Sequence, residues 1–292
     1  QTIDKSLQQI VGLLDPLQGV QFEKCENVYP FIGNLRKPFT LAIMLAKKAI
    51  PVGAKSGSSG FFFWQTKNGF NFKSIDGLIK NAVNLKSTAQ RYIYKQTMED
   101  GYANPAGNAV RIIDFKSNKN NDLTESLERG EYSSYRMYFN PLTFEFTQPK
   151  DAVFKPKDDV RLGHTEVMPA VADPDNIPVN YMAPRILTGV YNVGTLDVGV
   201  STAVNYDPYN DVAQGSARYS KFFTYDYTIL VPCNTNLTAG DPVYLEIPKT
   251  TTQSAEYDPE QSGLYIIKEI THKFYTNKSY TSMRVVRDTF GI

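Results

Sequence analysis

Apolar residues at helical spacing predict two helices near the start of the chain. The first is expected to end before Pro16, and Asp4 is placed to cap it. Pro38, at a first helical position, opens the second helix, whose apolar stripe begins at Leu41. A short strand is expected between them, from Val20 to Glu23. The apolar positions of the first helix are Ile3, Leu7, Ile10, Val11 and Leu14.

An alternating aromatic segment follows. Phe61–Thr66 and Phe70–Phe72 flank the pair Asn68 and Gly69. An Asn-Gly pair between alternating runs predicts a tight β-hairpin turn, because both turn residues are expected to adopt positive φ. Ser74 is then expected to cap a short helix from Ile75 to Lys80. The aromatic residues expected in a core or an interface are Phe61, Phe63, Phe70 and Phe72.

The middle of the chain changes character at about residue 150. Before it, strand-like segments occupy 91–95, 109–115, 132–139 and 142–146, and Leu123 and Leu127 before Gly130 indicate one short helix. Residues 150–184 are rich in proline and aspartate, which is typical of a linker or a long excursion. Residues 190–204 alternate weakly and contain several glycines, which suits an exposed β-ribbon or a loop.

The last eighty or so residues predict antiparallel β structure. A strand from Tyr219 to Val231 is followed by a turn at Gly240 and Asp241 and by a strand with Val243, Leu245 and Ile247 on one face. Two long strands, 264–275 and 280–290, form a hairpin. The aromatic residues proposed for subunit contacts are Tyr265, Tyr275, Tyr280 and Phe290. The predicted fold is α+β and β-rich, ending in a β-barrel or β-sandwich.

Composition narrows the functional classes. The 292 residues include 31 Lys and Arg against 30 Asp and Glu, and the basic residues are scattered along the chain. A net charge of +1 argues against a protein whose main role is to hold nucleic-acid phosphates. Only two His and two Cys are present. Cys25 and Cys233 have no CxxC partner, so two reduced thiols are favoured over a disulfide.

Each candidate for chemistry has a simpler explanation. Gly53-Ala-Lys55-Ser56 lacks the glycines of a phosphate-binding loop, and no serine lies in a Gly-x-Ser-x-Gly elbow. His164 and His272 are isolated, and accidental carboxylate pairs cannot identify a glycosidase. Two acidic groups lack the spacing of a calcium loop and suit turns instead: Asp173, Asp175 and Asn176, and Asp207, Asn210 and Asp211. No catalytic residue, cofactor or metal is therefore predicted, and no membrane insertion, since no run of eighteen apolar residues exists. This neutral, aromatic-rich composition is typical of an assembly subunit.

Two stretches resemble the baseplate hub proteins of contractile-tailed bacteriophages, the myovirus tail hub family. One runs from Arg36-Lys-Pro-Phe39 through the helix to Gly60–Asp76, with its aromatic strand, Asn-Gly-Phe turn and Phe-x-Ser-Ile end. The other comprises the C-terminal runs 237–243, 262–274 and 279–288. The resemblance covers about half of the chain in the right order, and its motifs are structural.

The resemblance implies a fold and a role. It implies a mixed α/β hub domain at 1–149, an extended linker at 150–188 and a tube-like β-barrel domain at 189–292. An N-terminal barrel is expected before Gln1. The implied protein is a non-enzymatic homotrimer of the virion tail baseplate, assembled in the host bacterial cytoplasm. Its ring would adapt the six-fold tail tube to the three-fold central spike and leave a channel for DNA. Implied partners are the tail-tube, central spike, baseplate wedge and tape-measure proteins.

Two other functions stay open at this point. One is a tail-tube or baseplate wedge component of the same particle. The other, less favoured, is a β-rich enzyme that degrades glycans of the bacterial envelope.

Overall fold

The structure of the chain is a computed structural model. It describes residues 1–15, 19–53, 60–94, 105–118, 128, 134–146, 153–154, 160–163, 185–193, 204–206, 213–249 and 257–289. The chain forms two compact units. The first, here the hairpin unit, comprises Gln1–Gly77, Asp122–Asp159 and Ala170–Ser220. The second, here the barrel unit, comprises Leu78–Asn121, Val160–Pro169 and Lys221–Ile292.

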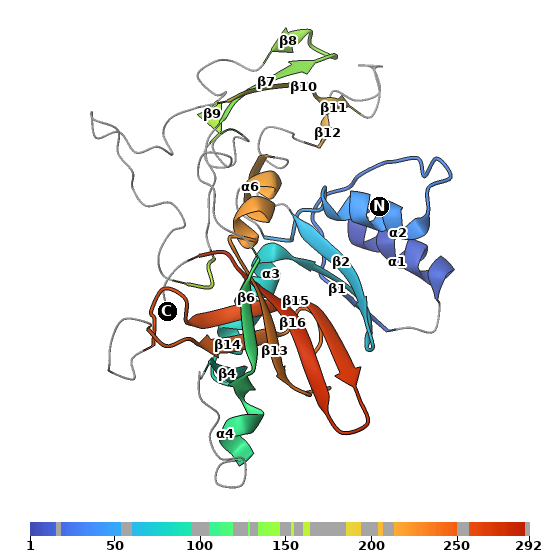
Figure 1. Cartoon of the computed structure of the whole chain (residues 1–292). Coiled ribbons are helices and arrows are strands. Elements are labelled where there is room, and N and C mark those ends of the chain that lie inside the picture. The colour runs from blue at the N-terminus through green and yellow to red at the C-terminus, as the bar shows by residue number, and fades with distance from the viewer. Residues whose placement is uncertain are drawn as a thin grey trace, which may run out of the picture. The chain divides into compact units, whose positions relative to one another are not determined.

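The described helices and strands confirm the α+β, strand-rich prediction (Figure 1). The helices are α1 (Ile3–Leu14), α2 (Pro38–Ala46), α3 (Ile75–Asn84), α4 (Pro105–Ala109) and α6 (Ala213–Phe222). The strands of the hairpin unit are β1 (Val20–Phe22), β2 (Phe61–Thr66), β3 (Gly69–Ser74), β7 (Ser134–Asn140), β8 (Glu145–Phe146), β9 (Val153–Phe154), β10 (Ile186–Val190), β11 (Asn192–Val193) and β12 (Val204–Tyr206). Those of the barrel unit are β4 (Gln90–Tyr94), β5 (Arg111–Ile112), β6 (Asp114–Ser117), β13 (Tyr225–Pro232), β14 (Pro242–Glu246), β15 (Gly263–Phe274) and β16 (Ser279–Arg287).

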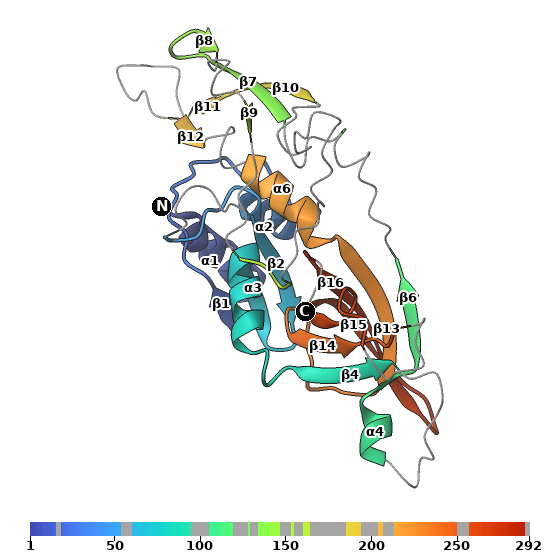
Figure 2. The ribbon, with the colours of Figure 1, turned by 90° about the vertical axis from the view of Figure 1, so that its left-hand side faces the viewer.

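The hairpin unit is built around a three-stranded sheet in the order β1-β3-β2. β2 and β3 pair antiparallel, whereas β1 pairs with β3 in parallel. Alternate residues of β2 and β3 face a core that also includes α1 and α2, which lie side by side in Figure 2. The buried residues of this core include Ile3, Leu7, Leu41, Leu45, Phe61, Phe63, Phe70 and Phe72.

Two smaller sheets complete the described part of the hairpin unit. In the first, β7 pairs in parallel with β10 and antiparallel with the short strands β8 and β9. In the second, β11 pairs antiparallel with β12. Ile186, Val190, Phe144 and Phe146 are all exposed by at least 60%, so much of the apolar surface around β7 is open to solvent.

The barrel unit consists of one seven-stranded sheet in the order β5-β4-β14-β15-β16-β13-β6. Its two edge strands are separated by a single residue, Ile113, whose N–H donates to the Leu230 carbonyl on β13 at 2.7 Å. The two edges of the sheet therefore meet, and the sheet almost closes into a barrel. Closure removes most of the free strand edge that an open sheet of this size would expose.

The sequence predicted most elements close to where they lie. α1, α2, both long hairpins and the β14 strand match their predicted ranges. Thr2 is the N-cap of α1, so Asp4 lies in its first turn and does not cap it. The predicted strand from Tyr219 begins only at Tyr225, because Tyr219 to Phe222 are the last residues of α6.

The barrel is not confined to residues 189–292, where the sequence placed it. Three of its seven strands, β4, β5 and β6, come from residues 90–117. Residues 160–163, within the predicted excursion, also belong to the barrel unit. The predicted helix at 123–127, most of the excursion and most of the 190–204 ribbon lie outside the described residues.

Candidate functional site

The described residues show how few of the candidates for chemistry can be placed. Among them, no three His, Cys, Asp or Glu residues lie close enough together to hold a metal ion. His164 and both predicted acidic groups lie outside the described residues, as does most of the Gly53–Ser56 motif. No helix in the described part of the chain is long and apolar enough to cross a membrane.

His272 takes part in a small polar cluster on β15 and β16. Its Nδ1 lies 2.9 Å from Thr281 Oγ1, and the Asn234 N–H donates to the same oxygen at 3.0 Å. The Asn234 amide also contacts the Tyr92 hydroxyl at 3.5 Å. Burial raises the pKa of Tyr92, and the Asn234 contact offsets part of that rise. Thr281, at the centre of these contacts, is fully buried.

Aromatic and aliphatic side chains fill the interior of the barrel. Tyr92, Tyr227 and Tyr265 are buried there, and Phe115 lies between Tyr94 and Tyr227 with ring centroids 5.8 and 4.7 Å away. Burial raises the pKa of Tyr265 to about 12 and also raises that of Tyr227. The barrel is therefore a packed core, as expected for a small barrel, and offers no lumen through which a polymer could pass.

The outer face of the barrel carries a network of charged groups. Asp226 on β13 accepts hydrogen bonds from Arg284 at 2.6 Å and Asn118 at 3.1 Å, and Lys268 lies 3.7 Å away. Burial of the carboxylate raises its pKa, but the hydrogen bonds and the charges of Arg284 and Lys268 outweigh it, so the pKa of Asp226 lies below its usual value. The network spans β15, β16 and β13 and reaches Asn118, the residue after β6.

The last residue of β16, Arg287, is a buried arginine. Arg287 is fully buried, and its Nη1 donates to the Ser262 carbonyl at 2.8 Å. Its guanidinium lies over the Tyr265 ring, 5.4 Å from the centroid. Gly263, with φ of +133°, leaves room for it, because a Cβ there would lie 3.0 Å from Nη1.

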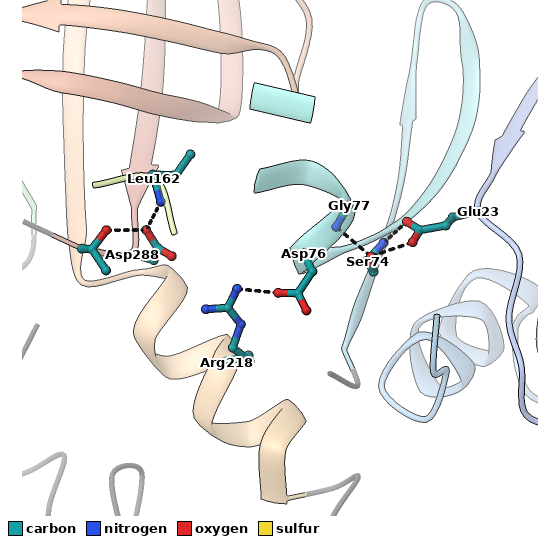
Figure 3. Close-up of polar contacts among 8 residues, drawn as sticks. Glu23, Ser74, Asp76, Gly77, Leu162, Arg218 and Asp288 are labelled. Atoms are coloured by element: carbon teal, nitrogen blue, oxygen red, sulfur yellow. Dashed lines mark hydrogen bonds and ion pairs between the residues drawn. The ribbon is translucent and has the colours of Figure 1, made fainter. Parts of the chain in front are cut away.

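Backbone amides of residues 162 and 163 are held beside β16. The Leu162 N–H donates to Asp288 Oδ1 at 3.1 Å (Figure 3). The Gly163 N–H donates to Thr289 Oγ1 at 2.8 Å. The Thr289 hydroxyl donates to Asp288 at 2.9 Å. These bonds fix part of the predicted excursion to the end of the barrel.

In the hairpin unit, a carboxylate organises the start of α3 (Figure 3). Glu23 accepts the Ser74 N–H and the Ser74 hydroxyl, each at 2.8 Å. Ser74 Oγ in turn accepts the Gly77 N–H at 2.9 Å, which is an N-cap bond. A Cβ on Gly77 would lie 2.4 Å from Glu23 Oε2, so the close approach requires glycine.

A second buried contact joins the first turn of α3 to α6. Arg218 Nη2 lies 2.5 Å from Asp76 Oδ1, and both residues are at most 8% exposed (Figure 3). The next residue on α6, Tyr219, donates its hydroxyl to the Phe61 carbonyl on β2. Sequence reasoning missed these pairs, because Asp76 and Arg218 are 142 positions apart and neither lies in a motif.

The predicted turn residues lie at or next to turns. The two-residue turn of the hairpin is Lys67 and Asn68, whereas Gly69 is the first residue of β3, pairs with Thr66 and has φ of +115°. Asn68 does not share this conformation, since the described non-glycine residues with positive φ are Asn34, Leu35 and Phe144. Gly240 has φ of +95°, and Asp241 Oδ2 accepts the Thr238 N–H at 2.7 Å just before β14.

The predicted interface residues are divided between interior and surface. Tyr265 fills the core of its own barrel and is fully buried, which removes it from the candidates for subunit contact. Tyr275, in the turn between β15 and β16, is 59% exposed, beside Phe274 at 68%. Tyr280 is partly exposed at the start of β16, and Phe290 lies outside the described residues.

Both cysteines are reduced thiols. Cys25 is buried and Cys233 is partly buried, and neither forms a disulfide. Burial and the nearby Asp4 raise the pKa of the Cys25 thiol, so this side chain is an inert core residue.

Comparisons with known proteins found similarity at the level of structure. No protein-family model matches the chain, and no curated protein matches its sequence. The tail protein from Neisseria meningitidis MC58 is 10% identical with a TM-score of 0.47, over 99% of this chain and 67% of that one. The 43 kDa tail protein of prophage MuSo2 from Shewanella oneidensis is also 10% identical, with a TM-score of 0.44, over 99% and 65%. The chain spans about two thirds of the length of each.

Proposed function

We propose that this chain is a structural, non-enzymatic protein of a bacteriophage tail, located in the baseplate hub. The observation that carries the proposal is the seven-stranded barrel whose edges meet at Ile113 and whose interior is filled. Such a barrel suits a rigid structural role, because it leaves few strand edges free and apolar side chains pack in its interior. The C-terminal and aromatic segments that resemble the hub family lie in this barrel and in the β2, β3 hairpin.

The proposed assembly is a homotrimeric ring. Because each barrel is packed, a channel for DNA must lie between subunits and not within one. A chain with a net charge of +1 suits a channel that passes DNA without holding it. The ring would adapt the six-fold tail tube to the three-fold central spike and would also contact baseplate wedge and tape-measure proteins.

The tip of the β15, β16 hairpin is the proposed subunit contact. Tyr275 and Tyr280 lie there, and Phe274 adds an apolar ring that is 68% exposed. Aromatic side chains that are exposed in a monomer and clustered at one place are typical of interface anchors. Lys278 Nζ lies over the Tyr280 ring at the same tip, 6.0 Å from the ring centroid.

The mass of the purified full chain in solution tests the ring. Light scattering after size-exclusion chromatography should give three copies, and Tyr275→Asp should shift the population to monomer. Tyr257→Asp, at a residue 43% exposed and outside the hairpin, is the matched control and should leave the trimer intact. A monomer at high concentration that binds neither tail-tube nor spike protein would contradict the hub role.

Two measurements separate the alternatives. In particles that contain the chain, density with six-fold symmetry at its position would indicate a tail-tube or wedge component instead. Clearing of envelope polysaccharide in a zymogram, abolished by changing one carboxylate, would indicate a glycan-degrading enzyme.

A further inference from the structure

The sheet of β7, β8, β9 and β10 has one covered face. Side chains alternate along a strand, so Ser134, Arg136 and Tyr138 lie on the same face of β7. All three residues are at most 9% exposed. Tyr138 packs over Gly189 of β10, because a Cβ added to this glycine would lie 2.6 Å from Tyr138 Cε1.

The other face of this sheet is apolar and open to solvent. Residues that pair across a ladder lie on the same side of a sheet, so the partners of Tyr135, Met137 and Phe139 extend their face. The Phe144 ring adjoins this face, since it packs edge-on against Phe139 with centroids 6.1 Å apart. The β7 face comprises Tyr135, Met137, Phe139, Phe144, Phe146, Ile186, Thr188 and Val190. None of these side chains is charged.

The exposed apolar area of the β7 face matches that of a protein interface. Phe144 and Phe146 are 80% and 60% exposed, and Ile186 and Val190 are 67% and 61% exposed. With roughly 150 to 200 Å² for each whole side chain, these four expose about 450 to 500 Å². A stable interface takes about 800 Å² from each partner, of which about 60% is apolar. The β7 face therefore supplies the apolar share of one side of such an interface.

A ring of three copies needs two different contact surfaces on each copy. In the proposed trimer the copies surround a channel, so they do not meet at the symmetry axis. Each contact then joins one surface of a copy to a different surface of the next copy. The tip of the β15, β16 hairpin, where Phe274 and Tyr275 are 68% and 59% exposed, is one such surface. The second surface must accept aromatic side chains.

Charge favours the β7 face over the apolar surface near α2 as this second surface. Residues 270–283, which include the tip, contain two lysines and no Asp or Glu. Leu35, before α2, is fully exposed, but two basic residues follow it, and like charges brought together oppose docking. At the edges of the β7 face, Glu145 is exposed, and Arg185 already donates to the Glu128 carbonyl at 2.6 Å.

We propose that the β7 face receives the tip of the β15, β16 hairpin of a neighbouring copy and is the second contact surface of the ring. Aromatic anchors that insert among apolar side chains are typical of stable interfaces. The inference rests on the proposed trimer and adds the surface that the trimer requires. Pairing of the β7 face with itself would instead form a dimer of two-fold symmetry and leave the tip unused.

The masses of full-length variants in solution test this surface. Phe146→Asp places a charge within the β7 face and should convert the trimer to a monomer, as should Ile186→Asp on β10. Leu13→Asp, at a residue of α1 that is 84% exposed, is the matched control and should leave the trimer intact. Light scattering after size-exclusion chromatography measures the masses. Urea midpoints from Trp64 fluorescence should match the wild type, which separates a lost contact from a lost fold.

A mixture of two defective variants tests whether the two surfaces meet each other. Phe146→Asp keeps an intact tip, and Tyr275→Asp keeps an intact β7 face. A one-to-one mixture should therefore form a pair of copies and nothing larger, because the remaining tip and the remaining β7 face of the pair are both defective. The pair should require at least about tenfold more protein than the wild-type trimer, since one contact replaces a closed set of three.

The outcomes distinguish this contact from the ring itself. A trimer that survives Phe146→Asp and Ile186→Asp but not Tyr275→Asp would overturn the inference and leave the ring in place. Monomers of both variants without a pair in the mixture would show that the β7 face does not receive the tip. Self-association of Tyr275→Asp that is lost when Phe146→Asp is added would assign the β7 face to a second β7 face. A wild type that is monomeric at high concentration would refute the ring, and this contact with it.

Discussion

The two long hairpins of this chain, β2 with β3 and β15 with β16, are held in place by different means. β15 and β16 have strands on both sides, β14 and β13, and their inner residues belong to the apolar core of the barrel. Among the described strands, the β2, β3 hairpin has a neighbour, β1, on the β3 side only, and its end is fixed by polar side chains from elsewhere in the unit. Antiparallel neighbours stabilise the β15, β16 hairpin, whereas individual buried contacts position the β2, β3 hairpin.

The two units also differ in how their ion pairs are buried and partnered. In the barrel, the Asp226 side chain is 4% exposed and has three partners, Arg284, Lys268 and Asn118, of which Arg284 is 35% exposed. In the hairpin unit, the Arg218 side chain is 2% exposed beside Asp76, whose side chain is 11% exposed. A buried carboxylate that loses its cation is costly, and the partners that remain reduce this cost. Loss of one polar side chain should therefore disturb the hairpin unit more than the barrel.

The largest expected effect is from Arg218→Met, compared with Arg284→Met. Arg218→Met leaves a buried carboxylate without its cation and should lower the free energy of unfolding by about 3 to 5 kcal/mol. Arg284→Met should cost about 1 kcal/mol, because Asp226 keeps Asn118 and Lys268. Urea unfolding measures both, and the single tryptophan, Trp64 on β2, reports the hairpin unit in its fluorescence.

A double variant checks the reason for this loss. Asp76→Leu combined with Arg218→Met removes both charges and should recover part of the stability lost in Arg218→Met. Equal losses for Arg218→Met and Arg284→Met would show that the partners left to Asp226 do not reduce the cost.

The next largest loss of stability is expected from a substitution at the turn of the β2, β3 hairpin. A Cβ on Gly69 would lie 2.0 Å from the Gly19 carbonyl oxygen, and φ there is +115°. Gly69→Ala should therefore displace β1 and cost about 3 kcal/mol. Gly53→Ala is the matched control, with φ of +76° and open space around the new Cβ, and should cost about 1 kcal/mol. Chemical denaturation followed by Trp64 fluorescence measures both, and similar midpoints for the two would contradict the steric reason.

Local signals made both hairpins, α1 and α2 predictable from the sequence. Alternating aromatic residues, the Pro38 helix start and the Gly69 turn act within a few positions. α6 was missed because Gly215 and Ser216 weaken its helical propensity, and the face it buries starts with the small residues Ala213 and Ala217. Its helical state depends on tertiary contacts, which no local pattern records.

Contacts between distant positions could not be predicted. β4 pairs in parallel with β14, about 150 positions later, and nothing in residues 90–94 specifies that partner. The buried pair of Asp76 and Arg218 likewise depends on α6 lying beside the start of α3. Sequence pattern predicts single strands and helices, whereas their neighbours are decided by contacts between distant positions.

Ser74→Ala should have an intermediate effect, because it removes two hydrogen bonds at the start of α3. Both its bond to Glu23 and its N-cap bond to Gly77 are lost, so about 1 to 2 kcal/mol is expected. Thr238→Ala removes a comparable hydroxyl bond to Asp241 in a turn of the barrel unit and should cost about 0.5 kcal/mol. Faster amide exchange at Gly77 in Ser74→Ala, beyond the global change, would tie the loss to the cap; unchanged exchange there would argue against it.

The smallest expected effect is the pH dependence of the barrel, carried by Asp226. Its pKa lies below the usual value in the folded chain, so its stabilisation is present above the unfolded pKa of about 4 and is lost as pH falls through the folded pKa. Asp226→Asn should therefore be less stable than the wild type by about 1 kcal/mol near pH 7, and the difference should disappear near pH 2. Amide exchange at Tyr227 and Ile229, both buried on β13, measures the barrel alone. In an Arg284→Met background the difference should already be smaller near pH 7, since much of what holds the pKa down is then absent. A difference that stays constant across this range would mean that the outer network does not stabilise the ionised carboxylate, and that the barrel depends on its apolar core alone.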